Sequence, residues 1–260
     1  RAAVSRAGLE GGEIEDVVFG SALVQGSTGV NPARHIALAS GLPSSVAGTA
    51  IDRQCASGLD AIAYAAHMIT AEGVDIALAG GIETISLVQE EHWNDYRYTS
   101  PSAPEAYYTS MLQTGENVAL RYGISRQAQD EYALQSQQRT AAAQAAGKLD
   151  DEIVPVETVK LVKDKQTGAV HEEAVRLERD ECNRPGTTRE ALAGLQPVLG
   201  PNATVTAGNA SQKSDGASAL VLMEASEAAR RGLSPLGIFR GFAVAGLPPE
   251  ELGIGLVGAI

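Results

Sequence analysis

The chain has 260 residues and a formal net charge of −12, with 32 acidic against 20 basic side chains. This negative balance argues against nucleic acid or an anionic membrane as a partner, and no run approaches the ~18 apolar residues of a membrane span. An anionic ligand would need locally concentrated Lys and Arg side chains.

Small apolar residues dominate the composition. Hydrophobic residues make up 44% of the chain and aromatic residues only 4%, and there are 28 glycines. This composition is typical of helices packed closely on a parallel sheet. Two cysteines far apart predict no disulfide framework, and the opening residues show no charged-then-apolar leader, so a reducing cytoplasm is expected. No spaced His/Cys/Asp cluster predicts a metal site.

The first predicted region runs to about Ser86 and alternates strands with helices. The Asn31-Pro32 pair predicts the start of one helix, and Gly41 with Pro43 predicts its end, because Asn is favoured at the N-cap, Pro in the first turn and Gly just past the last turn. The alternation predicts right-handed βαβ crossovers and a mostly parallel sheet. Strands are expected at 16–20, at 46–51 as a buried strand and at 74–79, and a second helix is expected at 59–70.

Cys55 follows the predicted strand 46–51 and precedes the predicted helix 59–70. Backbone N–H groups at a helix start favour negative charge, and so favour the thiolate of a nearby cysteine. The small residues that follow, Ala56 to Gly58, leave room for a carbonyl group, as an acyl-accepting nucleophile requires. The residues leave a second interpretation open, because a cysteine among Ala and Gly is commonly a small buried apolar residue.

The second predicted region, 87–212, loses the alternation. It begins with polar and aromatic residues that include His92 and Trp93, and it then carries a helix that Ser125 caps and Gly147 ends. Charged, turn-rich sequence follows that helix. After it the α/β character returns, with a strand expected at 217–223, a helix at 226–231 and a strand at 236–245.

The segment 204–216 is rich in small and hydroxyl-bearing residues. Small residues allow a ligand to lie against the backbone, and Asn209, Ser211 and Ser214 offer hydrogen bonds to it. The segment lacks the spacing of a phosphate-binding P-loop. A structured turn that only leads into the next strand explains the same residues, so both interpretations stay open.

The chain resembles the thiolase family in seven short motifs. Their order and spacing match the family from near Arg1 to near Ile260. The motifs are Asn31-Pro32-Ala33-Arg34, Cys55-Ala56-Ser57-Gly58, Ala79-Gly80-Gly81-Ile82-Glu83-Thr84-Ile85-Ser86, Met111 ahead of Gly115-Glu116-Asn117-Val118-Ala119, Asp151-Glu152-Ile153-Val154-Pro155-Val156, Arg184, and Val205-Thr206-Ala207-Gly208-Asn209-Ala210-Ser211. The resemblance implies an enzyme that cleaves or forms 3-ketoacyl-coenzyme A.

The resemblance also implies an α/β thiolase fold, layered α-β-α-β-α with an inserted loop domain. Residues 1–86 would form the N-terminal core with the nucleophile, and 87–212 the loop domain, which in the family binds coenzyme A and makes tetramer contacts. Residues 213–233 would return to the core, and 234–260 would begin the C-terminal half. The first strand of the N-terminal half is missing from the pattern.

Site residues carried over from the family are Cys55 as the acyl-carrying nucleophile and four coenzyme A contacts. Ala207 and Ser211 match positions at the pantetheine arm, Arg184 matches a basic residue near the adenine and 3′-phosphate, and Met111 matches an apolar residue over the pocket. Two alternative interpretations stay open, in which Arg184 is a solvated surface charge and Met111 is a core residue. Acyl-coenzyme A and coenzyme A are expected as substrates, with no separate cofactor, in a homodimer or homotetramer with His92 and Trp93 in a subunit contact.

The chain departs from the family in its catalytic C-terminal motifs. It has no Gly-His-Pro, no Asn-Glu-Ala-Phe and no second Cys-x-Gly motif, and the surroundings of Cys182 do not match the last of these. The sequence is therefore interpreted as part of a longer thiolase. A non-catalytic thiolase-like subunit that binds acyl-coenzyme A or serves assembly is the alternative, and a redox-responsive cysteine protein is a third.

Overall fold

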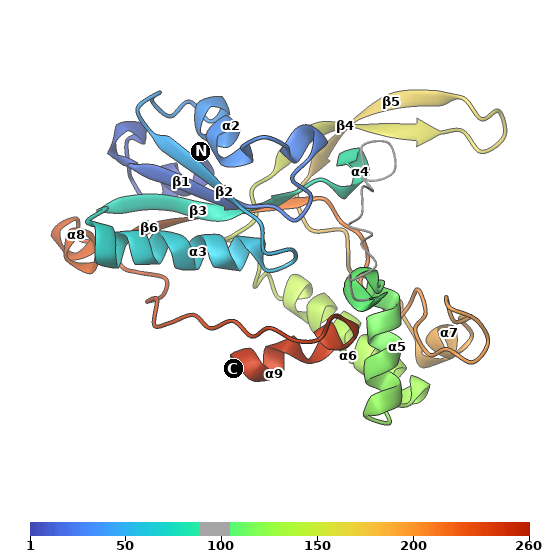
Figure 1. Ribbon diagram of the computed structural model, residues 1–260. Coiled ribbons are helices and arrows are strands. Elements are labelled where there is room, and N and C mark those ends of the chain that lie inside the picture. Colours follow the sequence, from blue (N-terminus) through green and yellow to red (C-terminus); the bar gives the residue numbers. More distant parts are fainter. Residues whose placement is uncertain (89–104) are drawn as a thin grey trace. The chain divides into compact units, whose positions relative to one another are not determined.

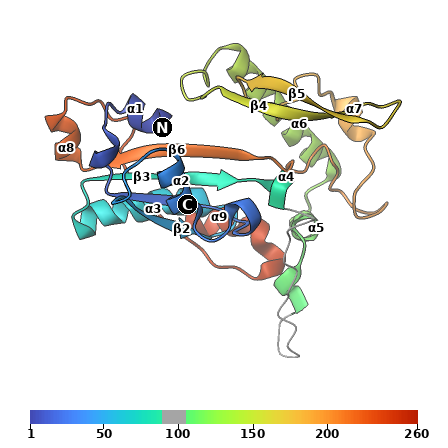
Figure 2. The same ribbon diagram turned by 90° about the horizontal axis from the view of Figure 1, so that it is seen from above.

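A computed structural model describes residues 1–88 and 105–260 of the protein. The chain divides into two compact units, which are treated one at a time below (Figures 1 and 2). The first unit lies within Arg1–Pro101 and Lys213–Val244, and the second within Ser102–Gln212 and Ala245–Ile260. The predicted subunit contact through His92 and Trp93 lies outside the described residues.

The first unit is built on a four-stranded sheet in the order β2-β1-β3-β6. Strands β2, β1 and β3 are parallel, and β6 runs antiparallel to β3. The prediction of a mostly parallel α/β sheet is thereby confirmed. The elements are β1 Asp16–Gly20, β2 Ala47–Ile51, β3 Ile76–Glu83, β6 Gly216–Met223, α1 Ala2–Arg6, α2 Pro32–Ala39, α3 Ser57–His67, α4 Ile85–Val88, α8 Ala225–Arg230, the short 3-10 turns Gly11–Glu13 and Gly26–Thr28, and a π turn Met68–Glu72 that continues α3.

Alternating side chains of β1 build a core on each face of this sheet. Val17 and Phe19 pack in one buried cluster with alanines of α2, whereas Val18 packs in a second cluster with alanines of α3. Helices α2 and α3 accordingly cover opposite faces of the sheet (Figure 1). The alternation follows from the two-residue repeat of a strand, and the small helix residues allow close packing.

Local capping signals set the ends of α2, as the sequence predicts. The Asn31 side chain accepts a hydrogen bond from the Arg34 backbone N–H at 3.1 Å, and Pro32 occupies the first turn. Gly41 follows the helix with φ +85°, a left-handed conformation that favours glycine.

Two sequence-based strand predictions need correction. The segment 46–51 is not a buried strand, because β2 is an edge strand that pairs only with β1 and most of its residues are half-buried. The predicted strand at 236–245 is absent, and the chain there is irregular, with Leu236 fully exposed. An apolar pattern forms a strand only beside another strand that takes up its backbone hydrogen bonds, and β6 pairs only with β3 in the described sheet.

Glycines bring the start of α3 directly onto the sheet. A Cβ atom added to Gly20 at the end of β1 would lie 2.1 Å from the backbone carbon of Ser57. A Cβ atom on Gly81 of β3 would lie 3.1 Å from the Cα of Gly58. Side chains would separate these backbones, so glycine is required for the contact. The turn that carries Cys55 is thus held at the carboxyl ends of β1 and β3.

The second unit consists of helices and a two-stranded hairpin. Its longest helix begins as predicted, because Ser125 accepts a hydrogen bond from the Ala128 N–H at 3.2 Å. The described helices are α5 Met111–Arg121, α6 Arg126–Ala145, α7 Arg189–Ala193 and α9 Gly255–Ala259, with 3-10 turns at Glu105–Tyr108 and Pro249–Ile254, and the antiparallel hairpin is β4 Val156–Lys163 with β5 Val170–Leu177.

The hairpin was not predicted from the sequence. Nearly all of its residues are exposed, and it pairs Lys160 with Glu173 and Leu161 with Glu172 across the strands. Because charged residues occur on both faces, the hairpin lacks the alternation of apolar and polar residues that marks a half-buried strand.

We expect Gly20→Ala to destabilise the first unit by at least ~3 kcal/mol, because the new Cβ atom would overlap the backbone of α3. The matched control is Gly12→Ala, whose Cβ would have its nearest neighbour at 3.9 Å. The control should change the free energy of unfolding by less than ~0.5 kcal/mol. Urea denaturation followed by circular dichroism measures both. Equal stability of the two variants would contradict the close contact.

Candidate active site

Cys55 lies in the turn between β2 and α3, and it is exposed. This finding contradicts the interpretation of Cys55 as a small buried apolar residue, whereas its role as the nucleophile stays a prediction. The residue before it, Gln54, has a φ of +49°, which is uncommon for a residue with a side chain. The turn therefore presents a thiol to solvent on a backbone of unusual conformation.

The start of α3 adds backbone N–H groups beside this thiol. The helix begins at Ser57 with Ala56 as its N-cap, and no side chain caps it. The Ser57 N–H donates to the Gln54 carbonyl at 3.0 Å. The other N–H groups of a first turn lack partners within the helix, so they favour negative charge nearby. The one acidic residue of that turn, Asp60, is engaged by Arg53 at 2.8 Å between Oδ2 and Nε.

In the second unit, Glu116 of α5 fastens the start of the segment 204–212. Its carboxylate accepts hydrogen bonds from the backbone N–H groups of Thr204 at 2.7 Å and Val205 at 2.6 Å, and from the Thr204 hydroxyl at 2.9 Å. Partial burial of the carboxyl acts to raise its pKa, but these three donors outweigh it and lower the pKa of Glu116 below the usual 4.5.

Asn209 holds the middle of the same segment. Its amide donates to Asp130 Oδ1 and to the Thr204 carbonyl, each at 3.0 Å, and its Oδ1 accepts from the Thr206 N–H at 2.8 Å. Asp130 is itself buried and paired with Arg126 at 2.8 Å. The prediction that Asn209 offers hydrogen bonds to a ligand is therefore wrong, because its polar atoms serve the fold.

The four predicted coenzyme A contacts lie on the surface of this second unit. Ala207, Ser211 and Arg184 are exposed, and Met111, the first residue of α5, is 61% exposed. The alternative of Met111 as a core residue is therefore wrong. The backbone of Arg184 is fixed, because its N–H donates to Gln137 Oε1 at 2.8 Å. Cys55 belongs to the first unit and these four residues to the second.

A family model described as the thiolase N-terminal domain matches residues 1–226. The chain is 44% identical over 263 residues to the 3-ketoacyl-CoA thiolase of Bacillus subtilis (strain 168), covering 99% of this chain and 66% of that protein. It is 38% identical over 272 residues to an acetyl-CoA acetyltransferase of Cupriavidus necator, and this match covers 100% of this chain and 67% of that protein. The chain belongs to the thiolase family.

The solved structure of the Bacillus anthracis acetyl-CoA acetyltransferase supports the same assignment. It matches with a TM-score of 0.81 and 36% sequence identity, over 98% of this chain and 65% of that one. The predicted thiolase fold is thereby confirmed. The chain spans 66% of the length of the B. subtilis relative and 56% of a peroxisomal 3-ketoacyl-CoA thiolase of Arabidopsis thaliana, so it corresponds to part of those thiolases.

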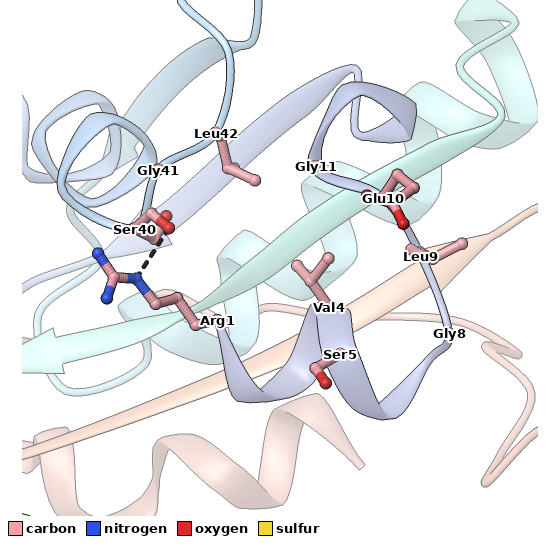
Figure 3. Close-up of a pocket in the computed structure, with 10 residues that line it drawn as sticks. All are labelled: Arg1, Val4, Ser5, Gly8, Leu9, Glu10, Gly11, Ser40, Gly41 and Leu42. Carbon is pink, nitrogen blue, oxygen red and sulfur yellow. Dashed lines mark hydrogen bonds between the residues drawn. The ribbon is translucent and has the colours of Figure 1, made fainter.

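Among the described residues of this thiolase chain, the first unit has a cavity of about 460 Å³ and the second unit has another of the same volume. The first lies between α1, the turn at 8–11 and the end of α2 (Figure 3). Arg1 lines it, and the Arg1 guanidinium donates to the carbonyls of Ser40 at 2.9 Å and Ala39 at 2.8 Å. The second lies between α5 and residues 199–204. None of the predicted site residues lines either cavity.

The described residues of this thiolase give no sign of a metal centre or a membrane span. Within 1–88 and 105–260, no three His, Cys, Asp or Glu side chains are grouped so that they could hold a metal ion. None of the helices in those ranges has the length and apolar character to cross a membrane. The expectation that no metal or cofactor takes part stays a prediction.

Two residues that stabilise the candidate site are not predicted from the sequence. Glu116 appears there only as part of the Gly115-Glu116-Asn117 motif, and Ser57 only as a small residue next to Cys55. In the structure, Glu116 bonds the segment 204–212, and Ser57 bonds the turn of Cys55. The available signal was their place inside motifs, because propensity alone makes a Glu inside a helix and a Ser at a helix start unremarkable.

We expect Glu116→Gln to lower the free energy of unfolding by about 1–3 kcal/mol at pH 7, because an amide cannot accept all three hydrogen bonds. The pKa of Glu116 is lowered in the folded state, so its stabilisation is present above the unfolded pKa and is lost as pH falls through the folded pKa. The difference between wild type and variant should therefore shrink on acidification.

Urea denaturation at several pH values measures this difference. The matched control is Glu181→Gln, since Glu181 is an exposed acidic residue of the same unit. A difference that is as large for the control, or that grows on acidification, would contradict the role given to Glu116.

Proposed function

We propose that this chain carries the nucleophile and part of the coenzyme A surface of a thiolase that cleaves or forms 3-ketoacyl-coenzyme A. One observation carries the proposal: a chain of the thiolase family exposes the thiol of Cys55 beside the start of α3. Relatives named 3-ketoacyl-CoA thiolase and acetyl-CoA acetyltransferase support this reaction class.

In the proposed reaction, the Cys55 thiolate attacks the 3-keto carbonyl carbon of the substrate. The tetrahedral adduct then breaks the bond between C2 and C3, which leaves the acyl group on sulfur and an acetyl-coenzyme A enolate that takes up a proton. The thiolate of a second coenzyme A attacks the acyl-cysteine and releases acyl-coenzyme A. Condensation runs the same steps in reverse.

These steps require a base for the thiol, an acid for the enolate and donors for the oxyanions. Because the chain lacks the family's Gly-His-Pro and Cys-x-Gly motifs, we assign those roles to residues outside these 260. The chain spans 66% of its B. subtilis relative, which leaves room for them in a longer protein.

Binding of coenzyme A is assigned to the loop domain at 87–212. Ala207 and Ser211 would contact the pantetheine arm from a segment whose backbone is fixed by Glu116 and Asn209. The exposed guanidinium of Arg184 suits a phosphate, because its planar fork can donate two parallel hydrogen bonds. Met111 would cover the pocket with an apolar side chain.

The assembly and the location belong to the same proposal. A homodimer or homotetramer is supported by the hairpin, because a two-stranded hairpin is marginally stable in isolation and this one exposes Val159 and Leu161. A cytoplasmic location is supported by two surface thiols, Cys55 and Cys182, which suit a reducing compartment.

A non-catalytic subunit that binds acyl-coenzyme A or serves assembly is the second candidate. This candidate predicts binding of acyl-coenzyme A without a covalent intermediate. The two candidates differ in whether an acyl group is transferred to Cys55.

In the longer thiolase that supplies the base, we expect labelled acetyl-coenzyme A to acylate Cys55 and to leave Cys182 unmodified. The protein is incubated with the label, quenched in acid and digested with trypsin, which separates the two cysteines into different peptides for mass spectrometry. Label on Cys182 with Cys55 unmodified would refute the assignment. Bound coenzyme A without any label would favour the non-catalytic candidate.

The matched variants are Cys55→Ala and Cys182→Ala. Cys55→Ala should abolish acylation and leave the dissociation constant of coenzyme A within about threefold, since the thiol contributes to the reaction more than to affinity. Cys182→Ala should be labelled like the wild type.

A further inference from the structure

The hydroxyl of Ser57 makes two hydrogen bonds across the turn that carries Cys55. It accepts from the Arg53 N–H at 2.8 Å and donates to the Gln54 carbonyl at 2.5 Å. Ser57 as a residue is only 2% exposed, so water has little access to these bonds. Cys55 therefore lies inside a loop whose two sides are joined by this buried oxygen and by two backbone hydrogen bonds, from the Ala56 N–H to the Arg53 carbonyl at 3.1 Å and from the Ser57 N–H to the Gln54 carbonyl at 3.0 Å.

Asp52 adds a third hydrogen bond at the entrance of the turn. Its Oδ1 accepts from the Gln54 N–H at 2.8 Å, in the geometry of a side chain that stabilises a turn two residues on. Together the two side chains bind both the N–H and the carbonyl of Gln54. These bonds hold that residue at its φ of +49°, which a side chain disfavours.

Neither side chain is needed for the neighbouring regular elements. The N-cap of α3 is Ala56 with no side-chain bond, and the Ser57 hydroxyl points back to the turn and not to the helix. Asp52 follows the last residue of β2, Ile51. Their hydrogen bonds therefore serve the conformation of the turn, and the reactive group of that turn is the Cys55 thiol.

We propose that Ser57 and Asp52 are positioning residues for the Cys55 nucleophile. The inference rests on the proposed function, in which the sulfur must meet a carbonyl carbon from one direction. A displacement of about 1 Å in such a step can lower the rate about 100-fold. The hydrogen bonds keep the thiol of an exposed turn in one orientation before the substrate arrives.

The test compares Ser57→Ala and Asp52→Ala with the wild type. In the longer thiolase that supplies the base, the rate constant for acylation of Cys55 by labelled acetyl-coenzyme A is measured over a range of concentrations. Ser57→Ala should lower the maximal rate constant about 10- to 100-fold and change the half-saturating concentration less than about threefold. Asp52→Ala should lower it about 3- to 10-fold, and Asp52→Asn, which keeps an Oδ1 acceptor, should recover most of this loss.

A second readout separates orientation from exposure. Alkylation of Cys55 by iodoacetamide is measured relative to Cys182 in the same molecules. This ratio should stay within about threefold of the wild type, because a small reagent reaches an exposed thiol from many directions. Asp75→Ala removes an exposed carboxylate elsewhere in the first unit and serves as the control for both readouts.

Circular dichroism establishes that each variant is folded. If Ser57→Ala does not fold, the exposed position of Asp52 keeps the inference testable through Asp52→Ala and Asp52→Asn. Acylation of the folded alanine variants at the wild-type rate would overturn the inference, as would an equal loss of acylation and alkylation. A wild type that binds acetyl-coenzyme A but is not acylated would instead overturn the proposed function.

Discussion

The position of Cys55 depends on a direct backbone contact between the start of α3 and the ends of β1 and β3. Gly20 and Gly81 on the strands leave no side chain between the sheet and the helix at Ser57 and Gly58. Backbone atoms in direct contact cannot move apart by a change of side-chain rotamer. The distance between α3 and the sheet therefore varies less here than where side chains lie between them. The turn before α3 inherits that fixed position, and the thiol is held where three parallel strands end.

In the second unit, polar side chains fix the backbone of the segment 204–212. Glu116 and Asp130 are carboxylates turned toward the protein, and each engages donors of the segment 204–212. These bonds occupy polar groups that face the protein, and the exposed residues of the segment are Ala207, Ser211 and Gln212. A fixed backbone with small exposed residues suits an extended ligand, which is the basis for assigning the pantetheine arm to this segment.

Local capping signals predicted where α2 and α6 begin, although α5 was not predicted, whereas non-local pairing decided the strands. Asn31 and Ser125 act as caps because a side chain bonds a backbone N–H three residues on, which the sequence alone encodes. The predicted strand at 236–245 failed although its apolar residues fit the pattern, since no strand of the described sheet lies beside it. The hairpin β4–β5 was not predicted because its two strands pair with each other although neither has an apolar face.

The sequence by itself determined the thiolase family, the junction at Cys55 and the capped starts of α2 and α6, because motifs and caps are properties of neighbouring residues. Only the tertiary structure decided that the thiol is exposed, that Asn209 is used internally, and that Ser57 bonds the turn. Burial and the choice of hydrogen-bond partner depend on residues distant in the chain. A small polar residue such as Ser57 looks alike in a sequence whether its hydroxyl faces water, a ligand or the backbone of a nucleophile.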